Sequence, residues 1–208
     1  MLTLIVFLIG QTYAQTANGQ PAQSDDNEAK WSFSLVTSGY LVPHDQSYGS
    51  PMFAADHRWL HLEARYNDED QQTGSVWAGY NLSVGEKLVL DATPMVGAVF
   101  GNTTGVAPGC ELALSYKRIE LSSEIEYVFS TSDHNHSFLY SWNELVYTPV
   151  GWFHAGLVSQ RTRAYHTDLD VQRGFSVGVT HKKINFTTYI FNAGWTDPTV
   201  VLALGFKF

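Results

Sequence analysis

The segment Asp133-His134-Asn135-His136-Ser137 places a hydroxyl side chain directly after one imidazole and three residues after another. A serine becomes a nucleophile when a histidine accepts its proton and a third group orients that histidine. Adjacent residues of an extended segment point to opposite faces, so His136 and Ser137 cannot meet through regular strand geometry. We interpret the segment as a polar loop and do not favour an enzyme.

Metal binding is the second chemistry that the histidines could support. His134 and His136 have i, i+2 spacing, as do His166, Asp168 and Asp170, which could place ligands on one side of a loop. A site would need a further ligand from another loop, and polar loops are common for solubility alone. We predict no metal site and no cofactor.

A larger set of ionisable residues falls on the polar face of segments in which apolar and polar side chains alternate. In 59–67, His61, Glu63 and Arg65 alternate with Leu62 and Ala64. If these segments form a membrane barrel, charges facing lipid would each cost roughly 2 to 4 kcal/mol near the midplane, so the lumen is their expected place. The residues predicted to line it are His61, Glu63, Arg65, Lys87, Asp91, Glu111, Lys117, Glu120, Glu124 and Glu126. Acids outnumber bases among them, which fits either an ion-pair network that closes the lumen or a polar lining that conducts solutes.

Period-two alternation recurs along 31–208 and predicts an all-β protein. The last run is the clearest, with Val200, Leu202, Leu204, Phe206 and Phe208 on one face. The same pattern appears in 75–82, 110–117, 120–129 and 172–180. Runs of roughly 8 to 12 residues with small, mixed residues on the polar face and aromatics at the ends of the apolar face are typical of transmembrane β-barrels.

The links between the runs alternate in length. Short links fall at 83–86, 117–119, 148–151 and 182–183, and longer polar links at 68–73, 101–106, 131–136, 164–170 and 196–198. Outer-membrane barrels place short turns in the periplasm and longer loops outside, so the pattern predicts an antiparallel up-and-down barrel. Ten strands follow from Trp59 onward, and 31–42 with 48–55 raise the total to about twelve. Pro51 is awkward in a strand, which leaves ten strands plus an N-terminal appendage as the alternative.

Composition supports this class of protein. Charged residues make up 15% of the chain and aromatic residues 14%, whereas soluble domains average roughly 25% charged residues. The net charge of −8 and the lack of a basic cluster argue against nucleic acid as a partner. Cys110 is the single cysteine of the sequence, so no internal disulfide can form, and its apolar surroundings suggest a small packed side chain.

The N-terminus suggests targeting. Residues 1–14 combine a short apolar run with small or polar residues before Ala14, as in a signal peptide, although no Lys or Arg precedes the run. Residues 15–30 read as a flexible polar lead-in, and 31–208 as the barrel.

The signal peptide, the strand rhythm and the C-terminal run give the chain a class-level resemblance to bacterial outer-membrane β-barrel proteins. The resemblance implies the outer membrane of a Gram-negative bacterium, contact with its lipids, and recognition of Leu204, Phe206 and Phe208 by the barrel-assembly machinery. Segment 133–143 is also similar to outer-membrane phospholipases, but it departs from their pattern, which places Ser two residues after His and then Asn-Gly.

The leading functional hypothesis is a porin-like channel for passive passage of small solutes or ions. A plugged structural or interaction barrel is the alternative, and a lipid-directed hydrolase comes third. The solute and the oligomeric state stay open.

Overall fold

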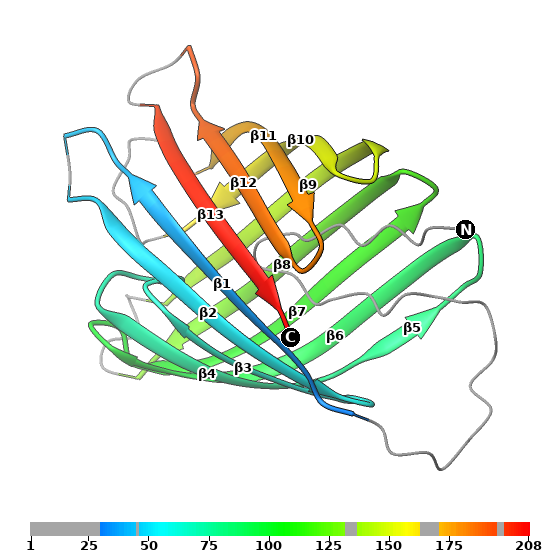
Figure 1. The fold of residues 1–208 in the computed structure, drawn as a ribbon. Helices are drawn as coiled ribbons and strands as arrows, with labels where there is room; N and C mark the ends of the chain where they lie inside the picture. The colour runs from blue at the N-terminus through cyan, green and yellow to red at the C-terminus, as the bar shows by residue number, and fades with distance from the viewer. Residues whose placement is uncertain (1–29, 45, 132–136, 163–170, 195–197) are drawn as a thin grey trace.

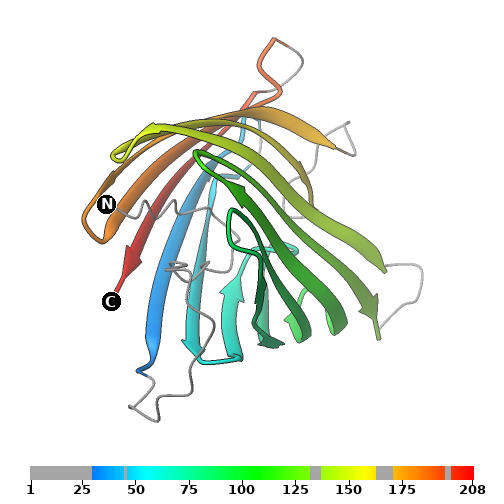
Figure 2. The same cartoon turned by 90° about the vertical axis from the view of Figure 1, so that its right-hand side faces the viewer.

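The computed structural model describes residues 30–44, 46–131, 137–162, 171–194 and 198–208. Within these ranges the chain is all β, and its strands form one antiparallel sheet that closes on itself (Figure 1). The sheet closes where β1 (Ser32–Leu41) pairs with β13 (Thr199–Lys207). Figure 2 shows the strands tilted around a common axis. The described part of the chain contains no helix that is long and apolar enough to span a membrane.

The other strands pair with their neighbours in chain order, as in an up-and-down barrel. They are β2 (Tyr48–His57), β3 (Leu60–Tyr66), β4 (Thr73–Tyr80), β5 (Leu82–Val84), β6 (Leu88–Gly101), β7 (Gly105–Tyr116), β8 (Ile119–Ser130), β9 (Phe138–Val150), β10 (Phe153–Arg161), β11 (Gln172–His181) and β12 (Ile184–Phe191).

β4 and β5 form a single wall strand with a break at Tyr80 and Asn81. Both pair with β6 in one unshifted register. In that register the partner of Tyr80 is Pro94, which has no N–H to donate to the ladder and so interrupts the pairing. The barrel therefore has 12 wall strands, as the sequence predicted, and β5 continues β4.

Pro51 lies inside β2, and the structure explains why the strand tolerates it. It pairs with Thr37 of β1 but precedes the first β2–β3 pair, Met52 with Arg65. The missing N–H therefore removes no rung from the ladder with β3. The alternative of ten strands with an N-terminal appendage is wrong, because β1 and β2 are wall strands.

Tight turns gather at one end of the barrel. Arg58, Lys117 and Lys182 begin two-residue turns with φ of 56°, 57° and 56°, the left-handed conformation that tight hairpins use. The strand ends that flank the connections 42–47, 67–72, 102–104, 131–137, 162–171 and 192–198 all lie at the other end. The predicted alternation of short and long links holds except at one pair, because 85–87 and 102–104 both have three residues.

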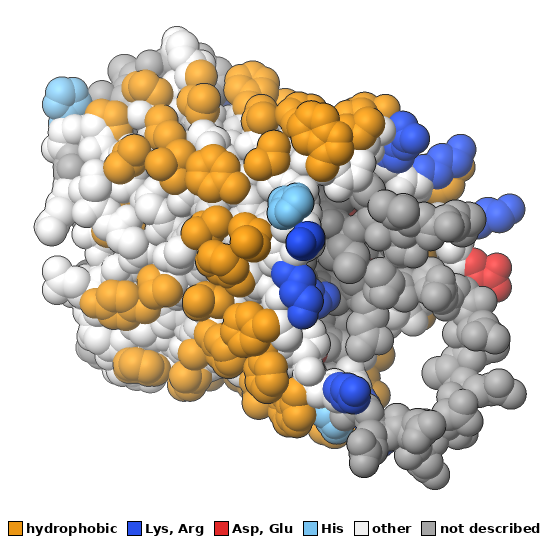
Figure 3. Space-filling model, viewed as in Figure 1, with side chains coloured by type: hydrophobic (Ala, Val, Ile, Leu, Met, Phe, Trp, Pro, Cys, Tyr) orange, Lys and Arg blue, Asp and Glu red, His pale blue; other side chains and the backbone are white. Residues whose placement is uncertain are grey.

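Side chains alternate between the inside and the outside of the wall. In β13, Val201 and Ala203 are buried, while Leu202 between them is 40% exposed. Every strand places exposed apolar side chains on the outside, and Figure 3 shows them gathered on one face of the barrel. Exposed aromatics lie near both ends of the strands, as interfacial girdles do: Trp31, Trp59, Tyr66, Tyr80, Phe100, Tyr116, Phe129, Tyr147 and Trp152. Such an exterior is stable only in lipid.

Candidate functional site in the barrel interior

Most of the ionisable residues predicted to line the lumen do point inward and are buried. They are His61, Glu63, Arg65, Asp91, Glu111, Glu124 and Glu126, from β3, β6, β7 and β8. These strands are close together along the wall, so one side of the interior is charged. The alternation of apolar and polar residues along the strands was sufficient to predict that these seven side chains face the interior.

Glu120 also lies on the inward face of β8, half-buried near its turn end, where it accepts a hydrogen bond from Ser115 Oγ at 2.9 Å. Two predicted lining residues lie elsewhere. Lys87 lies in the connection between β5 and β6, and Lys117 is the first residue of the β7–β8 turn; both side chains are exposed. Placing these lysines in the lumen is wrong, because the alternation was continued past the strand ends, where backbone geometry changes.

Arg65 is the centre of the charged side of the interior. Its guanidinium pairs with Glu63 on its own strand and, across the interior, with Glu124 and Glu126 of β8. Nη2 also lies 3.5 Å from Glu111 Oε1 of β7. The side chains of Arg65, Glu124 and Glu126 are fully buried. The cluster therefore links β3 to β7 and β8 within the charged side of the interior and carries more carboxylates than bases.

The ring of Trp77 on β4 packs against this cluster. Its centroid lies 4.9 Å from the guanidinium carbon of Arg65 in a cation–π contact. Trp77 is buried and packs with Met95, Val99 and Val128 in a small apolar group. The ring thus shields one face of Arg65 from water and strengthens its interactions with the carboxylates.

His61 lies on the turn side of the cluster. Its Nδ1 is 2.7 Å from Asp56 Oδ1, and its Nε2 is 3.0 Å from Glu63 Oε1. Asp56 Oδ1 also accepts a hydrogen bond from Asn81 Nδ2 at 2.7 Å. The ring is therefore held from both sides.

Loop 67–72 folds into the barrel mouth, which the sequence did not predict. Glu69 is fully buried and accepts hydrogen bonds from Ser75 Oγ and Trp77 Nε1. The backbone carbonyls of Asp68 and Glu69 accept from Thr162 Oγ1 at 3.2 and 3.4 Å. Thr162 follows β10, which lies opposite β3 in the order of the wall, so the loop crosses the mouth.

Asp68 brings a further carboxylate to the cluster. Its Oδ2 lies 3.4 Å from Arg65 Nη1. Burial raises the pKa of Asp68 to about 8; the guanidinium of Arg65 opposes this shift, and the carboxylates of Glu124, Glu69 and Glu63 add to it. The loop therefore adds a carboxyl that can change charge near neutral pH.

The facing side of the interior is aromatic. Trp142 of β9 makes edge-to-face contacts with Tyr189 and Phe191 of β12, at centroid distances of 5.1 and 5.6 Å. Tyr189 also donates a hydrogen bond to the buried Glu144, at 3.3 Å. Trp142, Tyr189 and Phe191 belong to a buried apolar cluster on this side of the interior.

The hydrolase candidates do not form a site in the described residues. His134, His136, His166, Asp168 and Asp170 lie outside the described residues. Ser137 Oγ accepts a hydrogen bond from the backbone N–H of Ser130. Ser141 and Asn143 alternate with the buried Tyr140, Trp142 and Glu144, so they belong to the outer face of β9.

The predicted assembly residues lie on the outer face of β13 at the closing seam. Phe208 exchanges backbone hydrogen bonds with Phe33, at 3.0 and 3.1 Å, and the two rings stack. Leu204 and Phe206 pair with Thr37 and Leu35 of β1. The C-terminal residue is therefore part of the rung that closes the barrel.

Comparison with known proteins identifies the architecture. No protein-family model matches the sequence, and no curated protein matches it. Among solved structures, the chain is similar to KdgM porin, with a TM-score of 0.57 and 10% identity over 84% of this chain and 99% of that one. KdgM porin in complex with disordered oligogalacturonate gives a TM-score of 0.55 at 10% identity, with the same coverage. The chain has the fold of an outer-membrane porin barrel.

A third similar structure is the outer membrane protein Omp33 of Acinetobacter baumannii, with a TM-score of 0.47 and 10% identity over 86% of this chain and 98% of that one. The porin fold agrees with the apolar exterior, because closed barrels of this kind span the bacterial outer membrane. The predicted location is supported by both observations.

Proposed function

We propose that the protein is an outer-membrane channel that passes small solutes with a preference for cations and is constricted at the Arg65 cluster. The excess of carboxylates around a single guanidinium carries the proposal. Carboxylates in a narrow, low-dielectric passage attract cations and repel anions at close range.

We expect this chain to disfavour the kind of ligand that was found with KdgM porin. KdgM porin has been captured with oligogalacturonate, which is a polyanion. In this chain the inward-facing Glu63, Glu111, Glu124 and Glu126 would repel such a ligand. We therefore expect small cationic or neutral solutes.

A closed structural barrel is the second candidate, and burial favours it. The side chains of Arg65, Glu124 and Glu126 have no exposed surface, and loop 67–72 crosses the mouth. A channel of this structure requires Arg65 to leave its cross-barrel partners or the loop to move, whereas a structural barrel requires neither.

Replacement of Arg65 separates the two candidates. Arg65→Met keeps an unbranched side chain against Trp77 but removes the charge, and Arg65→Lys retains the charge on a different head group. If the protein is a channel, its single-channel conductance in planar bilayers should be higher in Arg65→Met than in the wild type, and Arg65→Lys should differ little from the wild type. Absence of conductance in the wild type and in both folded variants would exclude a channel.

Heat-modifiable migration should accompany each recording, because Arg65→Met leaves buried carboxylates without their partner. Breaking a buried pair in this way costs roughly 3 to 5 kcal/mol. Only variants that retain the compact form should be compared.

A further inference from the structure

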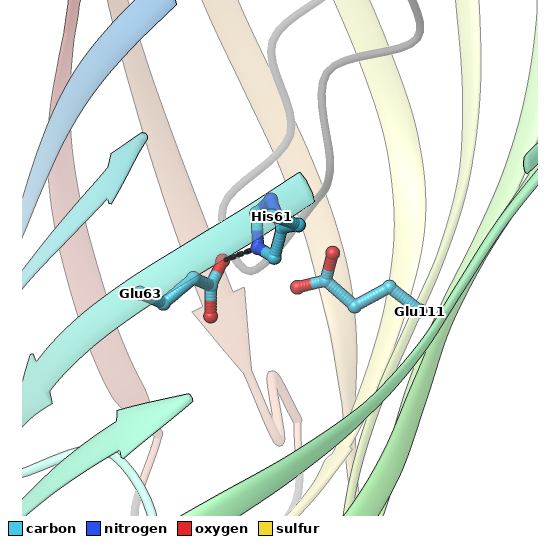
Figure 4. A group of neighbouring side chains, drawn as sticks. All are labelled: His61, Glu63 and Glu111. Atoms are coloured by element: carbon cyan, nitrogen blue, oxygen red, sulfur yellow. Dashed lines mark ion pairs between the residues drawn. The ribbon is translucent and has the colours of Figure 1, made fainter. Parts of the chain in front are cut away.

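Three potential metal ligands converge inside the barrel, on the turn side of Arg65. His61 and Glu63 lie two residues apart on β3 and point the same way, and Glu111 of β7 faces them (Figure 4). One ligand atom from each lies within 4.8 Å of the others, and all three residues are buried. Both carboxylates and the imidazole are thus directed at one small space.

The histidine is oriented as metal-binding histidines are. Asp56 Oδ1 is 2.7 Å from Nδ1, and a carboxylate can only accept, so Nδ1 carries the proton. In a ring that is protonated on Nδ1 alone, the lone pair of Nε2 faces Glu63 Oε1, 3.0 Å away. Two acceptors at this distance repel each other, so either a second proton on Nε2 or a cation between the two atoms must offset the repulsion. A carboxylate that orients a ligand histidine through its far nitrogen is a common outer-shell feature of metal sites.

Glu111 provides an independent reason to expect a ligand. The residue is 1% exposed, and neither carboxylate oxygen has a hydrogen-bond partner among the described residues. Within the described part of the chain, its one ion pair is the 3.5 Å contact of Oε1 with Arg65 Nη2. A buried carboxylate with so few partners is unfavourable, and Figure 4 shows it directed toward His61 and Glu63. A cation between the three side chains would satisfy all of them.

We propose that His61 Nε2 and one carboxylate oxygen each of Glu63 and Glu111 bind a divalent transition-metal ion of the Zn²⁺ class. One nitrogen and two oxygen ligands suit Zn²⁺ with an open fourth position, whereas Ca²⁺ and Mg²⁺ prefer oxygen ligands alone. Arg65 lies beside both carboxylates and weakens the site by repulsion. The proposal stands whether or not the barrel conducts.

Calorimetric titration of the refolded protein with ZnCl2 tests the site. We expect one ion per chain, with binding lost in Glu111→Gln and in His61→Gln. Glu111→Gln is the decisive variant, because it removes a charge that has no hydrogen-bond partner and preserves the shape, so it should fold as the wild type does. Asp56→Asn should weaken binding by about 10- to 100-fold, as is typical for outer-shell partners.

The loop histidines provide the control. His134→Gln/His136→Gln should bind Zn²⁺ as tightly as the wild type does, because the proposed site does not include them. A wild-type protein that binds no Zn²⁺, or a folded Glu111→Gln variant that binds it with wild-type affinity, would overturn the proposal. Loss of binding in the loop double variant alone would also overturn it and would place the ion outside the barrel.

Discussion

The guanidinium of Arg65 on β3 pairs with the carboxylate of Glu124 on β8, across the interior, although β4, β6 and β7 separate the two strands along the wall. The surroundings of this pair are acidic, and the opposite half of the interior is aromatic.

Stability should depend on the ionisation of Asp68. Its pKa is raised from 3.8 to about 8 in the folded protein. Between these two pKa values the folded protein retains a proton that the unfolded chain releases. The resulting stabilisation is fully present below the pKa of the unfolded chain, and it is lost as the pH rises to the pKa of the folded protein. Asp68→Asn cannot titrate and should lose less stability between pH about 4 and about 8. Unfolding in urea across this range measures the difference, and parallel curves for the two proteins would contradict it.

Deletion of Phe208 should reduce the amount of protein that reaches the membrane. Phe208 exchanges two backbone hydrogen bonds with Phe33 and stacks on its ring, so the deletion removes the last rung of the β1–β13 seam. Recognition by the assembly machinery would add to the defect. Cell fractionation with heat-modifiable migration is the measurement. Replacement of Lys207 by Gln is the control, and wild-type levels of the deletion variant would count against a role for Phe208.

A charge at Leu202 should destabilise the barrel through the lipid. Leu202 is 40% exposed on the outer face of β13. Arg at a lipid-facing site near the midplane costs roughly 2 to 4 kcal/mol, whereas Met at the same position keeps an apolar contact with the lipid. Unfolding in lipid vesicles compares Leu202→Arg with Leu202→Met. Equal free energies of unfolding for these two variants would show that this face does not meet hydrocarbon.

The loop across the mouth should limit conductance. Thr162→Val removes the hydroxyl that donates to the carbonyls of Asp68 and Glu69. A less tethered loop 67–72 leaves the mouth open for longer, so we expect larger or more frequent single-channel currents. Thr104→Val removes an exposed hydroxyl from another connection at the same end and serves as control. Identical currents in both variants would mean that the tether does not restrict passage.

The alternation of the sequence was enough to predict the wall and the faces of its strands. Because the side-chain period of a strand is two, Glu63, Arg65, Glu124 and Glu126 could be assigned to the interior without coordinates. The pairing of Arg65 with Glu124 could not be predicted in this way. It depends on how the wall curves and on which residues face each other across the interior, and neither is a local property.

Loop 67–72 and the turn lysines show where local patterns stop being informative. A polar loop has the same composition in water as in a barrel mouth, and only contacts such as those of Glu69 with Ser75 and Trp77, or of Thr162 with the loop carbonyls, distinguish the two. In the sequence, Lys87 and Lys117 continue the alternation of the neighbouring strands. In the structure both lie in connections between strands, where side chains no longer alternate between two faces.

Ion selectivity tests the central claim most directly. The protein should be reconstituted in planar bilayers under a KCl gradient, and its reversal potential measured beside those of Glu124→Gln/Glu126→Gln and of Glu86→Gln, a control in an exposed turn. We predict that the wild type and Glu86→Gln prefer cations, that the double variant loses much of this preference, and that high salt weakens it. An anion-selective wild type, or a double variant with the wild-type reversal potential, would contradict a cation-preferring channel constricted at the Arg65 cluster.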